Sequence, residues 1–111
     1  MLHNLNLQDK YFDFIKTGTK RIELRLFDEK RQKIQLGDTI EFANQQGETL
    51  RARVIGLLRY ESFAQLFADF DIELLADKSM TKAELMAALE EFYTPEKQAQ
   101  YGVVGIRLEL L

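Results

Sequence analysis

Three ionisable side chains of opposite charge, Lys20, Glu23 and Arg25, lie within one short stretch near the start of the chain. Lysine and arginine donate hydrogen bonds to phosphates and carbonyl groups, and the arginine fork donates two parallel bonds at once. A carboxylate between them can orient both cations, accept a hydrogen bond from a ligand, or act as an acid or base. On a solvated sheet face the same residues form only weak cross-strand pairs, each worth about 0.2–1 kcal/mol. The residue types alone therefore leave a binding site and an ordinary surface strand both open.

The charge of the chain is unevenly distributed along its length. The formal net charge is −3, but residues 16–33 contain seven bases and three acids, a local charge of 7 − 3 = +4. Residues 60–96 contain two bases and nine acids, which gives 2 − 9 = −7. This asymmetry favours one preferred face for an anionic ligand. A negative total disfavours a long duplex, whose binding needs many neutralised phosphates, and a short single strand or a nucleoside suits the chain better.

Several classes of site are excluded by residue content. The chain has no cysteine, which removes disulfides and thiolate zinc sites, and its single histidine, His3, makes an imidazole-based triad improbable. The acid-rich residues 69–77 lack the spacing of a calcium loop. We therefore expect no metal and no cofactor, and we expect His3 at the surface near a loosely held terminus. The absence of cysteine and of a long apolar window is typical of a cytoplasmic protein that does not span a membrane.

The elements that must position the charged triplet are a helix and a strand. Apolar residues recur at helical spacing over residues 9–17, and Gly18 follows where a helix often ends. Over residues 20–27 apolar residues alternate with charged ones. This alternation predicts a half-buried strand whose charged side chains lie on the face opposite the core.

Three further strands are predicted along the chain. Residues 38–44 and 49–61 flank a turn signal at 45–48, which indicates a hairpin. Gly56 lies inside the longer strand and is predicted to mark a bulge or a bend. The apolar, β-branched residues 101–111 read as the last strand.

The acidic part of the chain between these strands is predicted to be helical. Thr81 and Glu84 have the spacing of a capping box, and Leu85 and Phe92 of that helix are predicted to face the core. Pro95 limits its continuation. Three helical segments are expected: residues 62–70, 71–77 and 81–93.

The order of these elements predicts an α+β fold. The 111 residues are at the commonest domain size, so we expect a single domain over residues 1–111. There is no regular alternation of strand and helix, which argues against a parallel doubly wound sheet. A small, mostly antiparallel β-barrel flanked by helices, with a helical insertion before the last strand, fits the pattern better.

The string Gly18-x-Lys20-x-x-Glu23-x-Arg25 resembles the GxKxxExR signature of the ASCH domain family, which is related to the PUA domains. The surroundings are similar as well: "YFDFIKTG" precedes the signature, "LGDTIEF" follows it, and "YGVVGIRLELL" resembles the closing strand of the family. The resemblance implies a PUA-like barrel with a cleft between barrel and helices, lined by the signature residues. It also implies RNA binding, with Gly18 allowing the chain to leave the helix at positive φ.

We therefore predict an RNA- or nucleotide-binding protein whose cationic cleft is lined by Lys20, Glu23 and Arg25. Two tyrosines are candidates for stacking on a base: Tyr60, which follows Arg59 at a strand end, and Tyr101, which precedes the last strand. Arg59 is a further candidate for ligand binding. The oligomeric state is left open.

Two other functions remain open. One branch of the family hydrolyses N4-acetylcytidine with a threonine nucleophile three residues after the motif lysine, and this chain has Glu23 there. A hydrolase of a modified nucleoside, or a ribonuclease, is thus the alternative, with Lys20 and Glu23 as candidate catalytic residues. The other alternative is an interaction module that docks a partner through its acidic helical face.

Overall fold

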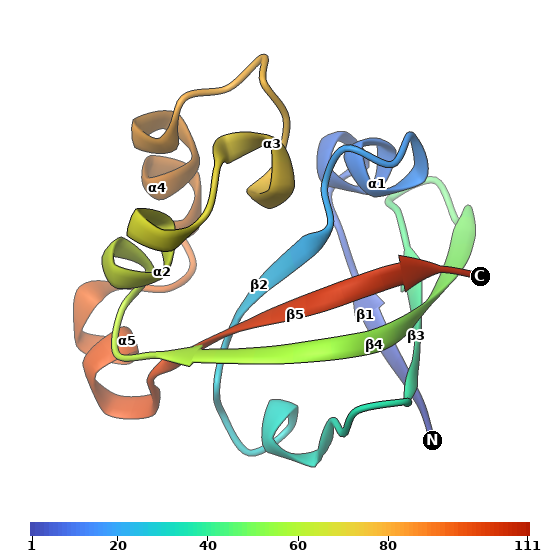
Figure 1. Cartoon of the computed structure of the whole chain (residues 1–111), viewed down its shortest axis with the longest axis horizontal. Coiled ribbons are helices and arrows are strands. Elements are labelled where there is room, and N and C mark those ends of the chain that lie inside the picture. The colour runs from blue at the N-terminus through green and yellow to red at the C-terminus, as the bar shows by residue number, and fades with distance from the viewer.

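One curved sheet carries helices on its convex and concave sides in the computed structural model, which describes residues 1–111 (Figure 1). None of the helices has the length and apolar composition needed to cross a bilayer. In chain order, the elements are β1 (Leu2–Asn6), α1 (Asp9–Lys16), β2 (Ile22–Leu26), the 3₁₀ turn η1 (Arg31–Lys33), β3 (Thr39–Ala43), β4 (Thr49–Tyr60), α2 (Phe63–Asp69), α3 (Ile72–Leu75), α4 (Lys82–Glu90), α5 (Pro95–Tyr101) and β5 (Val103–Leu110).

The five strands are hydrogen-bonded in the order β1-β3-β4-β5-β2. Only the β1–β3 pair is parallel, and the other three pairs are antiparallel. The sheet curls into a half-barrel, so the predicted α+β fold with a mostly antiparallel barrel and a helical insertion before the last strand is confirmed. Its two edge strands are β1 and β2. Arg25 of β2 donates from Nη2 to the Asn6 backbone oxygen at the end of β1, at 2.7 Å, and so bridges the two edges.

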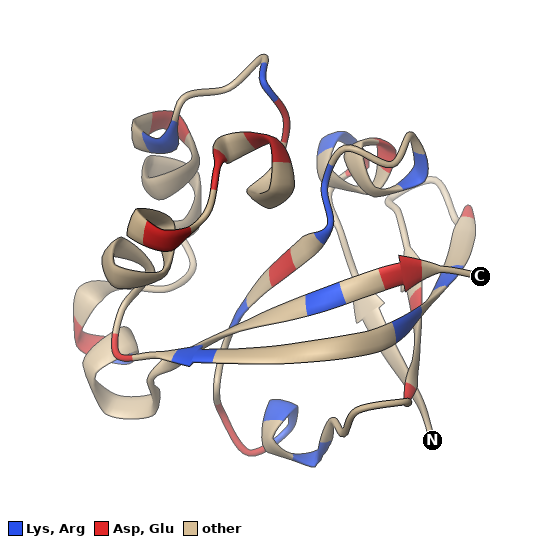
Figure 2. Ribbon diagram, in the orientation of Figure 1, with Lys and Arg blue, Asp and Glu red and all other residues tan.

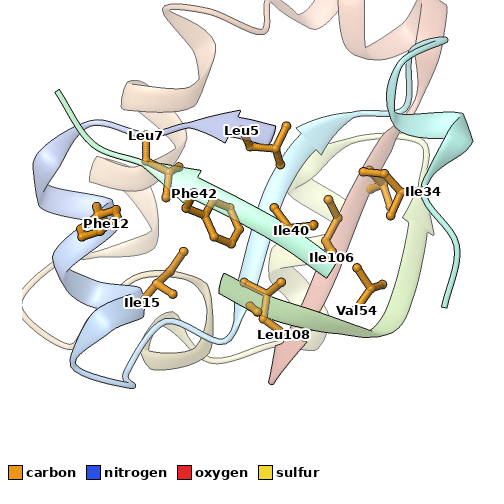
Figure 3. Close-up of a cluster of buried hydrophobic side chains, with 12 residues drawn as sticks. Leu5, Leu7, Phe12, Ile15, Ile34, Ile40, Phe42, Val54, Ile106 and Leu108 are labelled. Atoms are coloured by element: carbon orange, nitrogen blue, oxygen red, sulfur yellow. The ribbon is translucent and has the colours of Figure 1, made fainter. Parts of the chain in front are cut away.

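A separate hydrophobic cluster packs on each face of the sheet, but the outer face is covered only over β2 and the start of β5, and Arg53, Arg107 and Glu109 beyond that part are exposed. The first cluster fills the concave side between the strands and α1 (Figure 3). The second lies between β2, β5 and helices α2 to α4. Strand β5 supplies both, with Val104, Ile106 and Leu108 in the first cluster and Val103 in the second. Alternate residues of β5 therefore face opposite clusters, and the predicted last strand is confirmed.

Several local predictions are confirmed by the hydrogen bonds and the register. Strands β3 and β4 form the predicted hairpin, and the register of β4 against β5 shifts between Val54 and Gly56, where the bulge was expected. The Ser62 side chain accepts from the backbone N–H of Gln65 and begins α2. Thr81 begins α4. The local signals for the strands and for the first residues of the helices therefore agree with the tertiary structure over this part of the chain.

Replacing Thr81 with alanine should lower the free energy of unfolding by about 1 kcal/mol. The capping box is complete: the Thr81 hydroxyl accepts from the Glu84 N–H at 3.1 Å, and the Glu84 carboxylate accepts from the Thr81 N–H at 2.9 Å. The variant leaves the first turn of α4 with unsatisfied donors. Urea unfolding measures the change, and Thr81→Ser, which keeps the hydroxyl, is the control. Equal stability of the two variants would contradict the assignment.

Two elements were missing from the prediction, and the side chain of Phe92 was misplaced. Strand β1 precedes the first predicted helix, and α5 lies before the last strand. Pro95 does not only limit α4; it occupies the first turn of α5, where proline loses no helical hydrogen bond. Phe92 was predicted to face the core but is 55% exposed, because α4 ends at Glu90 and the chain turns away from its helical path there.

The prediction that His3 is a loosely held surface residue is wrong. Its side chain is only 11% exposed, and its Nε2 lies 2.8 Å from Asp38 Oδ2. The parallel pairing of β1 with β3 holds His3 opposite Ile40 and brings it to the carboxylate just before β3. This pairing joins segments far apart in the sequence, which is why terminal position alone was a poor guide.

The pH dependence of stability should show a contribution from Asp38. Its hydrogen bond with His3, together with the N–H of Gln35, lowers the pKa of Asp38 to about 2 from an ordinary 3.8. Because the folded pKa is depressed, the stabilisation is present above pH 3.8 and is lost as pH falls through about 2. We expect Asp38→Asn to be less stable than the wild type at neutral pH, with the gap closing over that window in thermal melts. A stability difference between Asp38→Asn and the wild type that does not change with pH would contradict this contribution of Asp38.

Candidate functional site

A pocket of about 460 Å³ opens where the first turn of α1, strand β2 and the C-terminal end of α4 meet. Lys20, Glu23 and Arg25 all line it, so the structure brings the predicted triplet together beside one hollow. More than half of the residues that line the pocket are hydrophobic. Its size and lining are those of a site for a small organic ligand.

The position of Glu23 and Arg25 follows from the register of β2. Glu23 lies opposite Ile106 and Arg25 opposite Val104, and side chains of opposed residues share a face. Both therefore project on the concave side of the half-barrel. The predicted alternation of β2 is confirmed, but its charged face is not solvated: Glu23 is 4% exposed, because residues of β1, α1 and α4 surround it on the concave side.

Glu23 is the centre of a buried ion network. Its Oε2 accepts from Arg25 Nε at 2.8 Å, and its Oε1 lies 3.4 Å from Lys20 Nζ. Burial acts to raise the pKa of Glu23, but the two cations outweigh it and hold that pKa below its ordinary value. Burial acts to lower the pKa of Arg25, and the Glu23 carboxylate outweighs it and raises that pKa. Both groups are thus ionised at neutral pH.

Lys20 is part of the scaffold of the pocket. Its Nζ donates to the backbone oxygens of Ile22 and Leu75, each at 2.7 Å, and contacts Glu23 as a third acceptor. Burial lowers the pKa of Lys20, and the Glu23 carboxylate opposes that shift. Three acceptors around one amine match the three protons of an ammonium, and they leave it no free donor for a ligand. Lys20 therefore ties β2 to α3 and fixes Glu23.

The hydroxyl of Tyr11 is not hydrogen-bonded within the chain and can bind a ligand. Tyr11 projects from α1 into the pocket and makes no side-chain hydrogen bond within the chain. Burial, followed by the carboxylates of Glu23 and Glu91, raises the pKa of Tyr11, so its hydroxyl stays protonated. The Gln45 side chain also lines the pocket. These groups can donate and accept hydrogen bonds from a guest.

The charges around the pocket are balanced. Two cations, Lys20 and Arg25, face two carboxylates, Glu23 and Glu91. The surplus of positive charge expected from the sequence is not concentrated here. Basic residues occur along β4, β5 carries both Arg107 and Glu109, and acidic residues lie on and between α2 and α3 (Figure 2). A neutral polar guest therefore fits this lining better than a free phosphate.

The remaining predicted ligand residues, Arg59, Tyr60 and Tyr101, lie elsewhere. They line a second hollow of about 890 Å³ between the end of β4 and α5, which shares no lining residue with the pocket. The Arg59 guanidinium lies 3.8 Å from the centre of the Phe27 ring, and the Tyr60 hydroxyl donates to Asp69 at 2.6 Å. Their role in ligand binding stays a prediction.

Gly18 connects α1 to the strand that carries the charged residues. Its φ of +88° lies in the left-handed region, which L side chains rarely adopt. The N–H of Gly18 donates to Ile15 and closes the end of α1. This turn places Lys20 just before the first residue of β2.

Sequence reasoning missed most of the residues that line the pocket, among them Tyr11, Glu91, Phe92 and Tyr93. Tyr11 lies within residues 9–17, which the sequence analysis treated only as an apolar helix. The other three follow the last turn of α4, and the only signal for them is a pair of aromatic residues just before Pro95. Aromatic residues at the end of a helix are not specific to a site.

The half-barrel with flanking helices and a buried charged triplet defines a small α+β protein with a ligand-sized pocket. The chain belongs to the ASCH domain family, whose model matches residues 5–111. It is similar to the crystal structure of the hypothetical protein PH0355, at 36% identity over 100% of both chains and a TM-score of 0.89. It is also similar to the solution NMR structure of protein PF0455 from Pyrococcus furiosus, at 34% identity over 100% of this chain and 98% of that one, with a TM-score of 0.79. No curated protein matches the chain.

Proposed function

We propose that the protein binds a nucleobase, from single-stranded RNA or from a nucleoside, in the pocket beside Glu23 and Arg25. The observation that carries the proposal is the buried pair itself: a carboxylate acceptor and a guanidinium donor 2.8 Å apart at the wall of a pocket of about 460 Å³. A base edge presents donors and acceptors side by side, and such a pair is complementary to it.

The balance of charge supports a base over a phosphate. A phosphate would leave the two carboxylates, Glu23 and Glu91, facing an anion in a partly dry site. A neutral base adds no charge, and the apolar lining favours its flat faces. Membership of a family with a generally RNA-binding type of fold supports a nucleic-acid ligand.

The aromatic side chains at the mouth support the same class of ligand. Tyr11 and Tyr93 both line the pocket, and the Tyr93 ring is fixed against Phe63 with its centre 5.9 Å away. Stacking of a base on an aromatic ring contributes about 1–3 kcal/mol. Rings held by the core lose little rotamer freedom when a ligand binds.

Filling the pocket should block binding without touching the ion network. Ala88 lines the pocket, whereas the neighbouring Ala87 is exposed and does not. We expect Ala88→Trp to weaken the binding of the best nucleoside at least about tenfold, or about 1.4 kcal/mol. Ala87→Trp, the matched control on the same helix, should change affinity less than about twofold. Titration calorimetry with the four ribonucleosides and short single-stranded RNA measures both.

The proposal fails if the wild type binds none of these ligands at low salt, or if Ala88→Trp binds as tightly as Ala87→Trp. Because the lining is neutral, the affinity for a nucleoside should change little between about 50 and 200 mM salt. A steep salt dependence would point to phosphate contacts outside the pocket.

Hydrolysis of a modified nucleoside is a second candidate, favoured by one observation. Lys20 and Glu23 are buried ionisable groups with shifted pKa values beside a pocket, a combination common at catalytic sites. Because Lys20 is fully hydrogen-bonded, its role in such a reaction is electrostatic, and Glu23 is the candidate acid or base. Release of cytidine from N4-acetylcytidine, followed by chromatography, tests it. Turnover by the wild type that is lost in Glu23→Gln supports it, and no turnover with excess protein rejects it.

A further inference from the structure

Phe92 is the only exposed phenylalanine of the eight in the chain, and it lies at the pocket. More than half of its surface, 55%, is exposed although it is one of the residues that line the hollow. Single exposed apolar residues are common on proteins. This one differs because it is located at the mouth of a candidate site.

The backbone around Phe92 is held firmly. The N–H groups of Phe92 and Tyr93 both donate to the Leu89 oxygen, at 3.1 and 2.8 Å. The Tyr93 oxygen in turn accepts from Gln98, a buried side chain, at 2.9 Å. The ring is therefore presented from a fixed turn, with its centre 6.5 Å from that of Tyr93. A platform fixed in this way needs little ordering when a flat ligand stacks on it.

We infer that Phe92 is a stacking platform for the nucleotide next to the one in the pocket, so that the ligand is single-stranded RNA of two or more nucleotides. The inference rests on the proposed function. A base inserted between Glu23 and Tyr11 leaves its sugar at the mouth, and the adjoining nucleotide must then lie on the rim. The exposed aromatic surface on that rim belongs to Phe92. Splayed bases stacked on aromatic rings are a usual mode of single-strand recognition.

The rim of the pocket at Phe92 can stack on a base but is poorly suited to contact a phosphate. Glu90 and Glu91 directly precede Phe92 in the chain, and both are exposed carboxylates. They disfavour a phosphate close to the ring but leave its face open to a base. The contribution of the second nucleotide should therefore depend weakly on salt.

The test compares nucleosides with trinucleotides of the same base, using the wild type, Phe92→Ala and Phe92→Tyr. We expect the wild type to bind the best trinucleotide about 5- to 100-fold more tightly than its nucleoside. Phe92→Ala should remove that advantage, lowering trinucleotide affinity far more than nucleoside affinity, while Phe92→Tyr, which keeps the ring, should retain it. Leu36→Ala removes another exposed side chain outside the pocket and is the control. Upfield shifts of the Phe92 ring protons should appear with the trinucleotide only.

Each failure has a separate signature. If the wild type binds nucleosides but gains nothing from the trinucleotide, or if the gain survives Phe92→Ala, the inference is overturned and the proposed function stands. If Phe92→Ala weakens nucleoside and trinucleotide equally, Phe92 is a wall of the pocket and the inference is again overturned. If the wild type binds neither ligand, the proposed function itself fails. A concentration-dependent dimer lost only in Phe92→Ala, with trinucleotide binding intact, would assign the ring to contact with a second copy.

Discussion

Replacing Lys20 with methionine should lower the free energy of unfolding by about 3–5 kcal/mol. Methionine keeps most of the volume of the side chain, so the loss reports on the ammonium. Its removal leaves the backbone oxygens of Ile22 and Leu75 without a donor and Glu23 with one counterion in place of two. Breaking one partner of a buried pair is expensive because the other charge remains buried.

Chemical denaturation of Lys20→Met beside Lys16→Met provides the measurement with its control. Lys16 pairs with Glu48 at the surface, where its side chain is 56% exposed. An exposed pair contributes at most about 1 kcal/mol, so Lys16→Met should be nearly neutral. If the two variants lose similar stability, Lys20 is not the tie between β2 and α3 that the hydrogen bonds describe.

The convergence of Lys20, Glu23 and Arg25 could be predicted from the sequence, but the burial of their face could not. Alternation over β2 places every second side chain on one side, which is a local property. What covers that side is β1 and the end of α4, and both come from distant parts of the chain. Burial therefore depends on pairing that periodicity does not encode. The same limit explains His3, which is held by the pairing of β1 with β3.

Arg59 shows why a residue on the correct face still does not reach the pocket. Val104 of β5 pairs with Arg59 of β4 on one side and with Arg25 of β2 on the other. The two arginines therefore lie in one row across the sheet, about 10 Å apart at the usual strand spacing. Val104 is buried between them, and the Phe27 ring takes up the guanidinium of Arg59. Strand order, which the sequence leaves open, separates them.

The first residues of helices α2 and α4 were easier to predict than the point where α4 ends and α5 begins. Thr81 and Ser62 carry end signals that depend only on near neighbours, and both caps form. Phe92 and Pro95 lie where one helix ends and another begins, and a helical pattern continued through that point gave Phe92 the wrong face. That misplaced residue is at the rim of the candidate site. The local rule failed there because the chain leaves its helical path between Glu90 and Pro95.

Replacing Gly105 with alanine should lower the free energy of unfolding by about 1–3 kcal/mol. Gly105 lies in the middle of β5, where glycine is normally a weak choice, so strand propensity alone predicts that alanine stabilises. A Cβ at this position would be 2.9 Å from Ile22 Cγ2 and 3.1 Å from Leu66 Cδ1. Both neighbours are fully buried in the second hydrophobic cluster and cannot move aside without disturbing the contact between α2 and the sheet.

A double-mutant cycle with Ile22→Ala isolates this contact. Ile22→Ala removes the nearest atom and leaves a cavity, at a loss of about 2–5 kcal/mol on its own. In the double variant the alanine at position 105 enters the vacated space, so the combined loss should be smaller than the sum of the two by about 1 kcal/mol or more. Urea unfolding of the four proteins gives the coupling. Strict additivity, or a stabilising Gly105→Ala, would show that the close packing of α2 on β5 and β2 is not what requires glycine there.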